Sequence, residues 1–168
     1  PGQYTVLNSS SEEVVEKAVQ DLQYHADFLD LLGVDISHKM ILHIGGVYGE
    51  KEEAVGRFVK NFRALPQNVQ NRLVLENDDK SYSISDVYKI CQTVEAPTVF
   101  DVFHHSIVPS NEHSTLEWLA LCHKTWQSKD GVQKIHYSEQ LADGKAGMHS
   151  QTISSQTFYD FYQSLSSE

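Results

Sequence analysis

Apolar residues recur at helical spacing in five segments of the chain, and each segment has one apolar face and one polar face. These segments are residues 11–32, 50–65, 85–94, 115–126 and 154–165. Ser11 can cap the first segment and Ser85 starts the third. Gly33 follows the end of the first segment, and Pro66 ends the second. The pattern therefore predicts five amphipathic helices.

Four short runs of consecutive apolar residues lie between these helices and are typical of buried strands. The runs are KMILHIGG, RLVLEND, PTVFD and VQKIH, with strands beginning near Met40, Leu73, Thr98 and Val132. Strands spaced roughly 25 to 35 residues apart and alternating with helices predict βα units and a parallel sheet whose faces are both covered. Because the sequence has no low-complexity segment and no linker, we expect residues 1–168 to form a single α/β domain.

Each predicted strand ends in a residue that can bind a metal ion. The strands end at His43, Glu76, Asp101 and His136, and His104 follows three residues after Asp101. The carboxyl ends of parallel strands lie at one edge of a sheet, where ligands and catalytic groups collect. One polar strand end is usually a turn or a hydrogen-bonded side chain. Because all four predicted strands end in such a residue, the pattern predicts one divalent-metal site shared by the four strand ends.

Side-chain alternation predicts which residues accompany these strand ends on each face of the sheet. Residues two positions apart in a strand share a face. The residues expected on the face of the site are Ile41, Val74, Val99 and Lys134, whereas Leu42, Leu75 and Ile135 are expected to face the covering helices.

The ligand types narrow the chemistry of the predicted site. Oxygen and nitrogen ligands without thiolate suit zinc, manganese or iron rather than a structural cysteine site. Several ligands suggest more than one ion, and carboxylate-bridged metals typically hydrolyse phosphodiesters by activating water and stabilising the leaving oxygen. Gly45, Gly46 and Gly49 would let a phosphate approach the backbone, or they simply form a turn.

Lys134 does not fit simply among these ligands, because its ammonium group would be repelled by cations. Three alternatives remain open for this lysine. Its side chain stays neutral, faces away from the site, or is carboxylated to an anion.

Net charge and cysteine content limit the class of protein further. The formal charge of −10 argues against broad adhesion to nucleic acid, unless bound cations neutralise the carboxylates. Cys91 and Cys122 form no C-x-x-C pair, and their apolar surroundings predict reduced core thiols in a cytoplasmic protein. The sequence has no apolar run long enough to cross a membrane and no secretory leader.

Six motifs, in this order, resemble the UV damage endonuclease family. They are PGQYTVLNSS, LHIGGVYGEKEEAVGRF, RLVLENDDKSYS, PTVFDVFHH, KIHYSEQ and MHSQTIS, and the resemblance extends from Pro1 to about Phe161. The resemblance implies a TIM-barrel fold and a DNA repair enzyme that nicks damaged double-stranded DNA on the 5′ side of ultraviolet photoproducts. It also implies a cluster of divalent metals, with manganese favoured and zinc or magnesium as alternatives.

The resemblance also implies roles for individual residues. The implied metal ligands are His43, Glu76, Asp101, His104, His136 and His149, of which His149 follows from the family pattern alone. Lys134 matches a lysine that is carboxylated in the family, and we expect it to act with Glu76 and Asp101 in catalysis. Gln3 and Tyr4 match a pair that probes the DNA duplex and fills the gap left by an extruded lesion.

The chain departs from the family pattern at both ends. The family has a histidine ligand directly before the Pro-Gly-Gln-Tyr motif and a glutamate ligand on its last strand, and both positions fall outside residues 1–168. Because a complete barrel takes about 250 residues, we expect a partial TIM barrel, truncated at both ends, whose open sheet edges favour self-association. Two alternatives are a sugar isomerase or epimerase of the xylose-isomerase-like group and a fragment that binds metal without catalysis.

Overall fold

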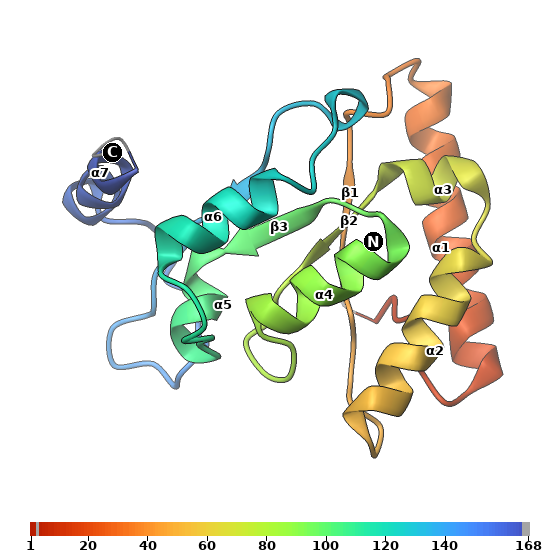
Figure 1. Ribbon diagram of the computed structural model, residues 1–168, viewed down its shortest axis with the longest axis horizontal. Helices are drawn as coiled ribbons and strands as arrows, with labels where there is room; N and C mark the ends of the chain where they lie inside the picture. Colours follow the sequence, from red (N-terminus) through yellow and green to blue (C-terminus); the bar gives the residue numbers. More distant parts are fainter. Residues whose placement is uncertain (3, 166–168) are drawn as a thin grey trace.

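The computed structural model describes residues 1–2 and 4–165, and in this part of the chain a four-stranded parallel sheet alternates with helices (Figure 1). The strands, in the sheet order β1-β2-β3-β4, are β1 (Met40–His43), β2 (Leu73–Glu76), β3 (Thr98–Asp101) and β4 (Ile135–His136). The helices are α1 (Glu12–Leu31), α2 (Lys51–Arg63), α3 (Gln67–Arg72), α4 (Ile84–Val94), α5 (Val102–Ile107), α6 (Thr115–His123), the 3₁₀ turn η1 (Ser128–Asp130) and α7 (Ser155–Ser164). The predicted parallel sheet is confirmed.

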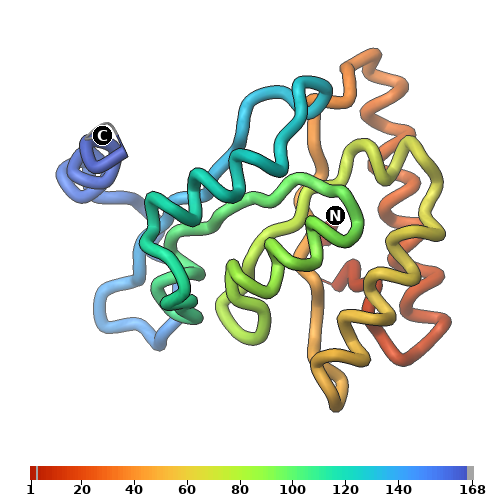
Figure 2. Tube along the Cα trace, viewed as in Figure 1, coloured from red at the N-terminus to blue at the C-terminus, as the bar shows by residue number. Residues whose placement is uncertain are grey.

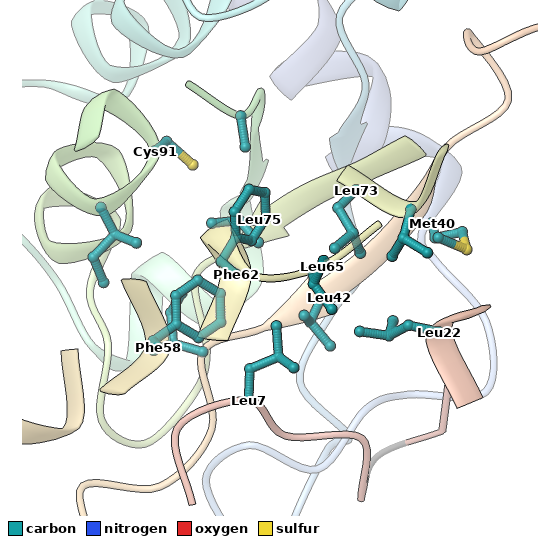
Figure 3. Close-up of a cluster of buried hydrophobic side chains, with 14 of the residues drawn as sticks. Leu7, Leu22, Met40, Leu42, Phe58, Phe62, Leu65, Leu73, Leu75 and Cys91 are labelled. Atoms are coloured by element: carbon teal, nitrogen blue, oxygen red, sulfur yellow. The ribbon is translucent and has the colours of Figure 1, made fainter. Parts of the chain in front are cut away.

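The sheet has two differently packed faces, as the alternation of side chains predicts. Leu42 and Leu75 point into a core built from helices on one side of the sheet, where they meet Phe58 and Phe62 of α2 (Figure 3). The opposite face carries Ile41, Val74 and Val99, which pack with Trp126. The strand residues therefore divide between the faces with the expected period of two.

The two cysteines are free thiols in the interior, which confirms the prediction of reduced core residues. Cys91 lies in the main core with α2 and β2. Cys122 packs with Phe100 and Trp118 in a second cluster. Burial raises the pKa of the Cys91 thiol to about 12 and raises that of Cys122 as well, because the interior disfavours a thiolate.

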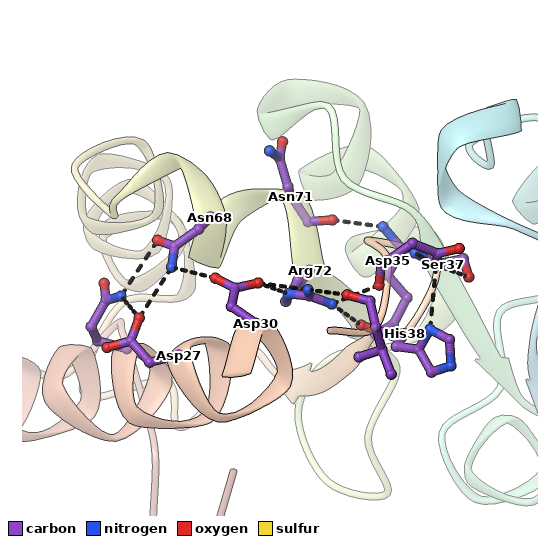
Figure 4. Close-up of polar contacts among 11 residues, drawn as sticks. Asp27, Asp30, Asp35, Ser37, His38, Asn68, Asn71 and Arg72 are labelled. Carbon is purple, nitrogen blue, oxygen red and sulfur yellow. Dashed lines mark hydrogen bonds and ion pairs between the residues drawn. The ribbon is translucent and has the colours of Figure 1, made fainter. Parts of the chain in front are cut away.

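Arg72 connects the end of α1 to the start of the sheet (Figure 4). Its guanidinium is buried and donates a hydrogen bond to Asp30 Oδ1 at 2.6 Å. It also donates to the backbone carbonyl oxygens of Val34, Asp35 and His38, in the segment just before β1. Because Arg72 directly precedes β2, these bonds align the first residues of β1 and β2.

Two helix starts differ from the sequence prediction. Ser11 occupies the N-cap position of α1, but its side chain makes no capping hydrogen bond. Helix α4 is capped by Ser83 rather than Ser85, because the Ser83 hydroxyl accepts from the Asp86 backbone while the Asp86 carboxylate accepts from Ser83. The hydroxyl of Ser85 is used elsewhere and donates to Glu112.

The later elements are shorter than predicted. Helix α6 ends at His123 rather than at residue 126, and the Thr125 hydroxyl then bonds the carbonyl oxygen of Cys122. Strand β4 comprises two residues, because Val132 is exposed and the preceding Gly131 has a φ of 78°. Helix α7 lies at the opposite end of the molecule from α1 (Figure 2).

Candidate metal centre

The carboxyl ends of the strands open into a cavity of about 1070 Å³. Seven residues that the sequence selects line this cavity: Tyr4, His43, Glu76, Asp101, His104, His136 and His149. The strand register explains part of this convergence, since His43 pairs with Glu76 and Asp101 pairs with His136. Strands β1 and β2 therefore end at one level, as do β3 and β4, and all four present their last side chains to a common space.

Two groups of side chains within the cavity have the geometry to hold metal ions. One group is His43, Glu76 and His104, and the other is Glu76, Asp101 and His136. Within each group the potential ligand atoms lie within 4.8 Å of one another. Because Glu76 belongs to both groups, its carboxylate could contribute a ligand atom to each of them.

The electrostatics of the two carboxylates fit such cations. Glu76 and Asp101 are both about 3% exposed, and buried carboxylates are costly unless they are paired. Burial raises the pKa of Asp101, with a further rise from the charge of Glu76, despite a hydrogen bond from the His104 backbone. A divalent cation between the two carboxylates would offset both the burial and their repulsion, so this donor set suits a metal ion.

Nearby imidazoles partly compensate the charge of Glu76. Burial would raise the pKa of Glu76, but hydrogen bonding by His136 and the charges of His43 and His136 lower it overall. His136 Nδ1 lies 2.7 Å from Glu76 Oε1, and this hydrogen bond raises the pKa of His136. Because the imidazoles of His43 and His136 already lie beside the carboxylate of Glu76, each could bind a cation held by Glu76 instead of contacting the carboxylate directly.

His104 is oriented by the short helix that follows β3. The carboxylate of Asp101 caps α5 by accepting a hydrogen bond from the backbone N–H of His104 at 2.8 Å. His104 Nδ1 lies 2.9 Å from the carbonyl oxygen of Asn77, so Nδ1 must carry the hydrogen. In the neutral imidazole the lone pair then lies on Nε2, where it could bind a metal ion.

His149 reaches the cavity from a loop rather than from a strand end. This loop is closed by an antiparallel bridge between Gln140 and His149. The His149 ring lies edge-on to the rings of Phe103 and His104, with centroid separations of 5.0 and 5.6 Å. The rule that parallel strands end at one edge of the sheet cannot predict a residue in a loop. Only the family resemblance indicated His149.

Lys134 does not join the ligands. Its ammonium group lies 3.2 Å from the carbonyl oxygen of Ser37 and 5.1 Å from the ring centroid of Trp126. Ser37 precedes β1, so Lys134 is directed toward the opposite end of the sheet from the cavity. This arrangement corresponds to the alternative in which Lys134 faces away from the site.

The amino-terminal segment is held against the cavity by Asn8. The buried Asn8 amide donates to the carbonyl oxygen of Gly46 at 2.6 Å, and Arg57 donates to the Asn8 carbonyl oxygen. Tyr4, on the same segment, is 83% exposed and lines the cavity. Gln3 lies outside the described residues.

The glycine-rich turn after β1 serves internal packing. A Cβ at Gly45 would overlap the Asn8 side chain, and a Cβ at Gly46 would press on the Tyr48 ring. These two glycines therefore make room for neighbouring side chains. Sequence reasoning missed Asn8 and Tyr48 as residues that shape the cavity, although Tyr48 lies only five residues beyond the end of β1.

A parallel sheet alternating with helices, with carboxylates and imidazoles gathered at the carboxyl ends of its strands, defines an α/β protein with a candidate metal centre. The chain belongs to the UV-endonuclease UvdE family, which it matches over residues 1–167.

Individual relatives agree with this assignment. The chain is 43% identical to a UV DNA damage endonuclease from Clostridium perfringens (strain 13 / Type A), covering 98% of this chain and 40% of that protein. It is 35% identical to a UV DNA damage endonuclease from Bacillus cereus (strain Q1), covering 91% of this chain and 48% of that protein. The chain thus spans about half the length or less of these curated relatives.

Solved structures confirm the fold. The crystal structure of SacUVDE matches with a TM-score of 0.90 and 43% identity, covering 97% of this chain and 54% of that one. D-psicose 3-epimerase from Clostridium cellulolyticum H10 matches with a TM-score of 0.60 at 16% identity, covering 83% of this chain and 50% of that one, a likeness of fold alone. The predicted α/β fold of a partial TIM barrel is confirmed.

Proposed function

We propose that this protein is a metal-dependent DNA repair endonuclease that nicks double-stranded DNA on the 5′ side of ultraviolet photoproducts. The observation that carries the proposal is the convergence of two ligand groups, linked by Glu76, at the floor of an open cavity. Membership of the UV-endonuclease family supports the substrate class. Relatives named UV DNA damage endonuclease are longer than this chain, so the activity is proposed for the whole protein.

The proposed cofactor is a cluster of divalent metals, with manganese favoured and zinc or magnesium as alternatives. When bound, such ions supply an activated water and stabilise the charge of the leaving oxygen. Glu76 would bridge the two positions, with His43 and His104 on one side and Asp101 and His136 on the other. His149 stands beside His104 and is proposed as a further ligand.

The proposed DNA contacts lie on the amino-terminal segment. Asn8 holds this segment against the glycine turn, and the Tyr4 ring is exposed at the cavity. An aromatic ring in this position can replace the stacking lost when a damaged dinucleotide leaves the duplex, and damaged bases cost less to extrude than sound ones. We assign the same probing role to Gln3.

Carboxylation of Lys134 is a separate part of the proposal. In the structure the Lys134 amine lies over the ring of Trp126 and donates a hydrogen bond to the carbonyl oxygen of Ser37. A carbamate would lose its attraction to the aromatic ring and the carbonyl oxygen, and would be drawn toward cations at the site. Intact-mass measurement in bicarbonate buffer, with Lys134→Arg as the control, should show a wild-type mass gain of one carbon dioxide.

Nicking of plasmid DNA tests the proposed activity. Ultraviolet-treated supercoiled plasmid should be converted to nicked circles in the presence of manganese, whereas untreated plasmid should stay supercoiled. Glu76→Gln should abolish nicking, because it weakens both ligand groups. Glu13→Gln, the same change at an exposed helix position, should leave nicking unchanged. Equal cutting of both plasmids would remove the damage specificity, and metal binding without any cutting would favour the non-catalytic alternative.

We also propose that the chain associates through its sheet edges. Strands β1 and β4 are the outer strands of the described sheet, and unpaired strand edges favour pairing with other chains. Static light scattering should give a mass above that of one 19.0 kDa chain. A monomer at all concentrations would contradict this proposal.

A further inference from the structure

Asn77 follows β2 directly and lies entirely in the interior, between the ligands of both groups. Its side-chain Nδ2 donates to the carbonyl oxygen of Asp101 at 3.0 Å, and its Oδ1 accepts from the backbone N–H of Asp101 at 2.9 Å. Its own backbone carbonyl oxygen accepts from His104 Nδ1 at 2.9 Å. One buried residue thus makes three hydrogen bonds to two candidate ligands.

The side chain of Asn77 extends the sheet where its backbone ladder stops. The last paired residues of β2 and β3 are Glu76 and Val99, so Asp101 lies two residues beyond the register. Asn77 uses its amide as a backbone unit would, donating to one group of Asp101 and accepting from the other. Among side chains of this size, an amide alone offers a donor and an acceptor in this arrangement.

The backbone of Asn77 controls the imidazole of His104. A carbonyl oxygen can only accept, so its contact with Nδ1 places a hydrogen on Nδ1, and in the neutral ring the lone pair then lies on Nε2. The side chain of Asn77 in turn fixes where this carbonyl oxygen points, because two hydrogen bonds anchor the residue to Asp101. Asp101 belongs to one ligand group and His104 to the other.

We infer that Asn77 is a positioning residue that fixes the backbone of Asp101 and the tautomer of His104, and thereby sets the affinity of both cation positions. This inference rests on the proposed metal-dependent function. It assigns to Asn77 a role that neither its polar character nor its place after a strand indicates. Partners of this kind, which hold the ligands rather than the ion, typically change metal affinity by 10- to 100-fold.

Cobalt and manganese titrations test the effect on affinity. Asn77→Leu keeps the branched shape and the number of side-chain heavy atoms while removing both side-chain hydrogen bonds, and Asn77→Ala removes the hydrogen bonds together with most of the side chain. Both variants should bind Co²⁺ and Mn²⁺ about 10- to 100-fold more weakly than the wild type. Val69→Ala is the control, because Val69 is buried in α3 at the opposite end of β2 and its loss lowers the melting temperature without touching a ligand.

Nitrogen-15 spectra of the imidazoles, recorded without metal, test the tautomer of His104 directly. This readout does not depend on how much stability a variant loses. In the wild type, His104 should show the signals of a hydrogen on Nδ1 and an unprotonated Nε2. In Asn77→Leu these signals should shift toward a mixture of both tautomers, whereas Val69→Ala should keep the wild-type pattern.

The outcomes separate the inference from the proposed function. Wild-type affinity in Asn77→Leu, or a neutral His104 ring in the wild type whose hydrogen is on Nε2 and not on Nδ1, would overturn the positioning role. A wild-type protein that binds neither Co²⁺ nor Mn²⁺ would overturn the proposed function and the affinity part of this inference. The tautomer measurement would then still decide whether Asn77 orients His104.

Discussion

Glu76 is the residue shared by both ligand groups, and it is one of two buried carboxylates at the site. Its negative charge is held near the imidazoles of His43 and His136. Because a ligand that binds only the folded chain stabilises it, metal binding through Glu76 should raise the melting temperature.

Manganese should therefore stabilise the wild type and fail to stabilise Glu76→Gln. At a free metal concentration of 100 times the dissociation constant, the wild type should gain about 2.7 kcal/mol. Thermal melts with and without Mn²⁺ measure this gain. Glu13→Gln should respond as the wild type does, since Glu13 is exposed on α1. An equal shift in Glu76→Gln would show that the metal binds elsewhere.

A second prediction at the scale of residues concerns Gly45, which combines a φ of 106° with close contact to Asn8. Gly45→Ala should strain the backbone and displace the Asn8 side chain, which loses its bond to Gly46. We expect a loss of about 1–3 kcal/mol in the free energy of unfolding, measured by urea denaturation.

Gly33→Ala provides the matched control. Gly33 also has a positive φ, but a Cβ there meets open space. Its substitution should cost only the backbone strain, so Gly45→Ala should be the more destabilising of the two. Equal losses would mean that the Asn8 contact contributes nothing.

The individual residues of the site were predictable to different degrees. His43, Glu76, Asp101 and His136 follow from one rule, that parallel strands end at one edge. His149 was accessible only through family resemblance, because a loop has no periodicity that reports where it folds back.

The alternation of side chains along a strand does not predict where the Lys134 side chain ends or which residues Asn77 contacts. Alternation assigns Lys134 to the face of the site, but its long side chain runs along that face to Trp126 and Ser37. Asn77 resembles any polar turn residue in the sequence, and its importance depends on three hydrogen bonds to two residues, 24 and 27 positions away, that only the fold brings together.

At the scale of elements, the start of α4 depends on reciprocal bonds between Ser83 and Asp86, with Lys51 of α2 as a further partner of the carboxylate. Burial would raise the pKa of Asp86, but the hydrogen bonds from Lys51 and Ser83 lower it overall. A carboxyl whose pKa is lowered by folding stabilises the folded state while it is ionised.

Asp86→Asn should consequently reduce stability in a pH-dependent manner. The contribution of Asp86 is complete above the ordinary aspartate pKa of 3.8 and is lost as the pH falls below it toward the lowered folded-state pKa. We expect a loss of about 1 kcal/mol at pH 7 that shrinks below pH 3.8. Urea denaturation across this range measures it, with exposed Glu16→Gln as the control. A loss independent of pH would contradict the assignment.

The long helices and the first three strands were predictable, and the short helices were not. The helices with several turns show clear apolar spacing, and the first three strands are bounded as expected. Helices α3 and α5 have six residues each, fewer than two turns, so periodicity cannot reveal them. Helix α5 in particular begins because Asp101 caps it, and its sequence VFHHSI alone resembles a loop.

At the scale of the whole molecule, a chain with a net charge of −10 is proposed to bind DNA, which is itself an anion. Cations at the cavity would reduce the repulsion where the phosphate backbone approaches. The repeated βα units of the sequence predict the parallel sheet, whereas the partial TIM barrel was predicted through the family resemblance, and both agree with the solved structures of similar fold.

Removal of divalent metal should therefore weaken DNA binding as well as cutting. Fluorescence anisotropy with an ultraviolet-treated duplex should show tight binding in Mn²⁺ and markedly weaker binding after addition of a chelator. Sodium chloride at equal ionic strength should not restore the affinity, because the effect requires ions held by the cavity ligands. Wild-type affinity in the presence of chelator would argue that the chain contacts DNA without its metal centre.

Both native cysteine thiols lie in the interior, where burial suppresses the thiolate. A maleimide fluorophore should accordingly not react with Cys91 and Cys122, and should react only with a cysteine added at the surface. Tyr4→Cys would then carry a single dye beside the cavity, with no native cysteine replaced. The emission of this dye could follow the approach of a duplex to the amino-terminal segment in real time.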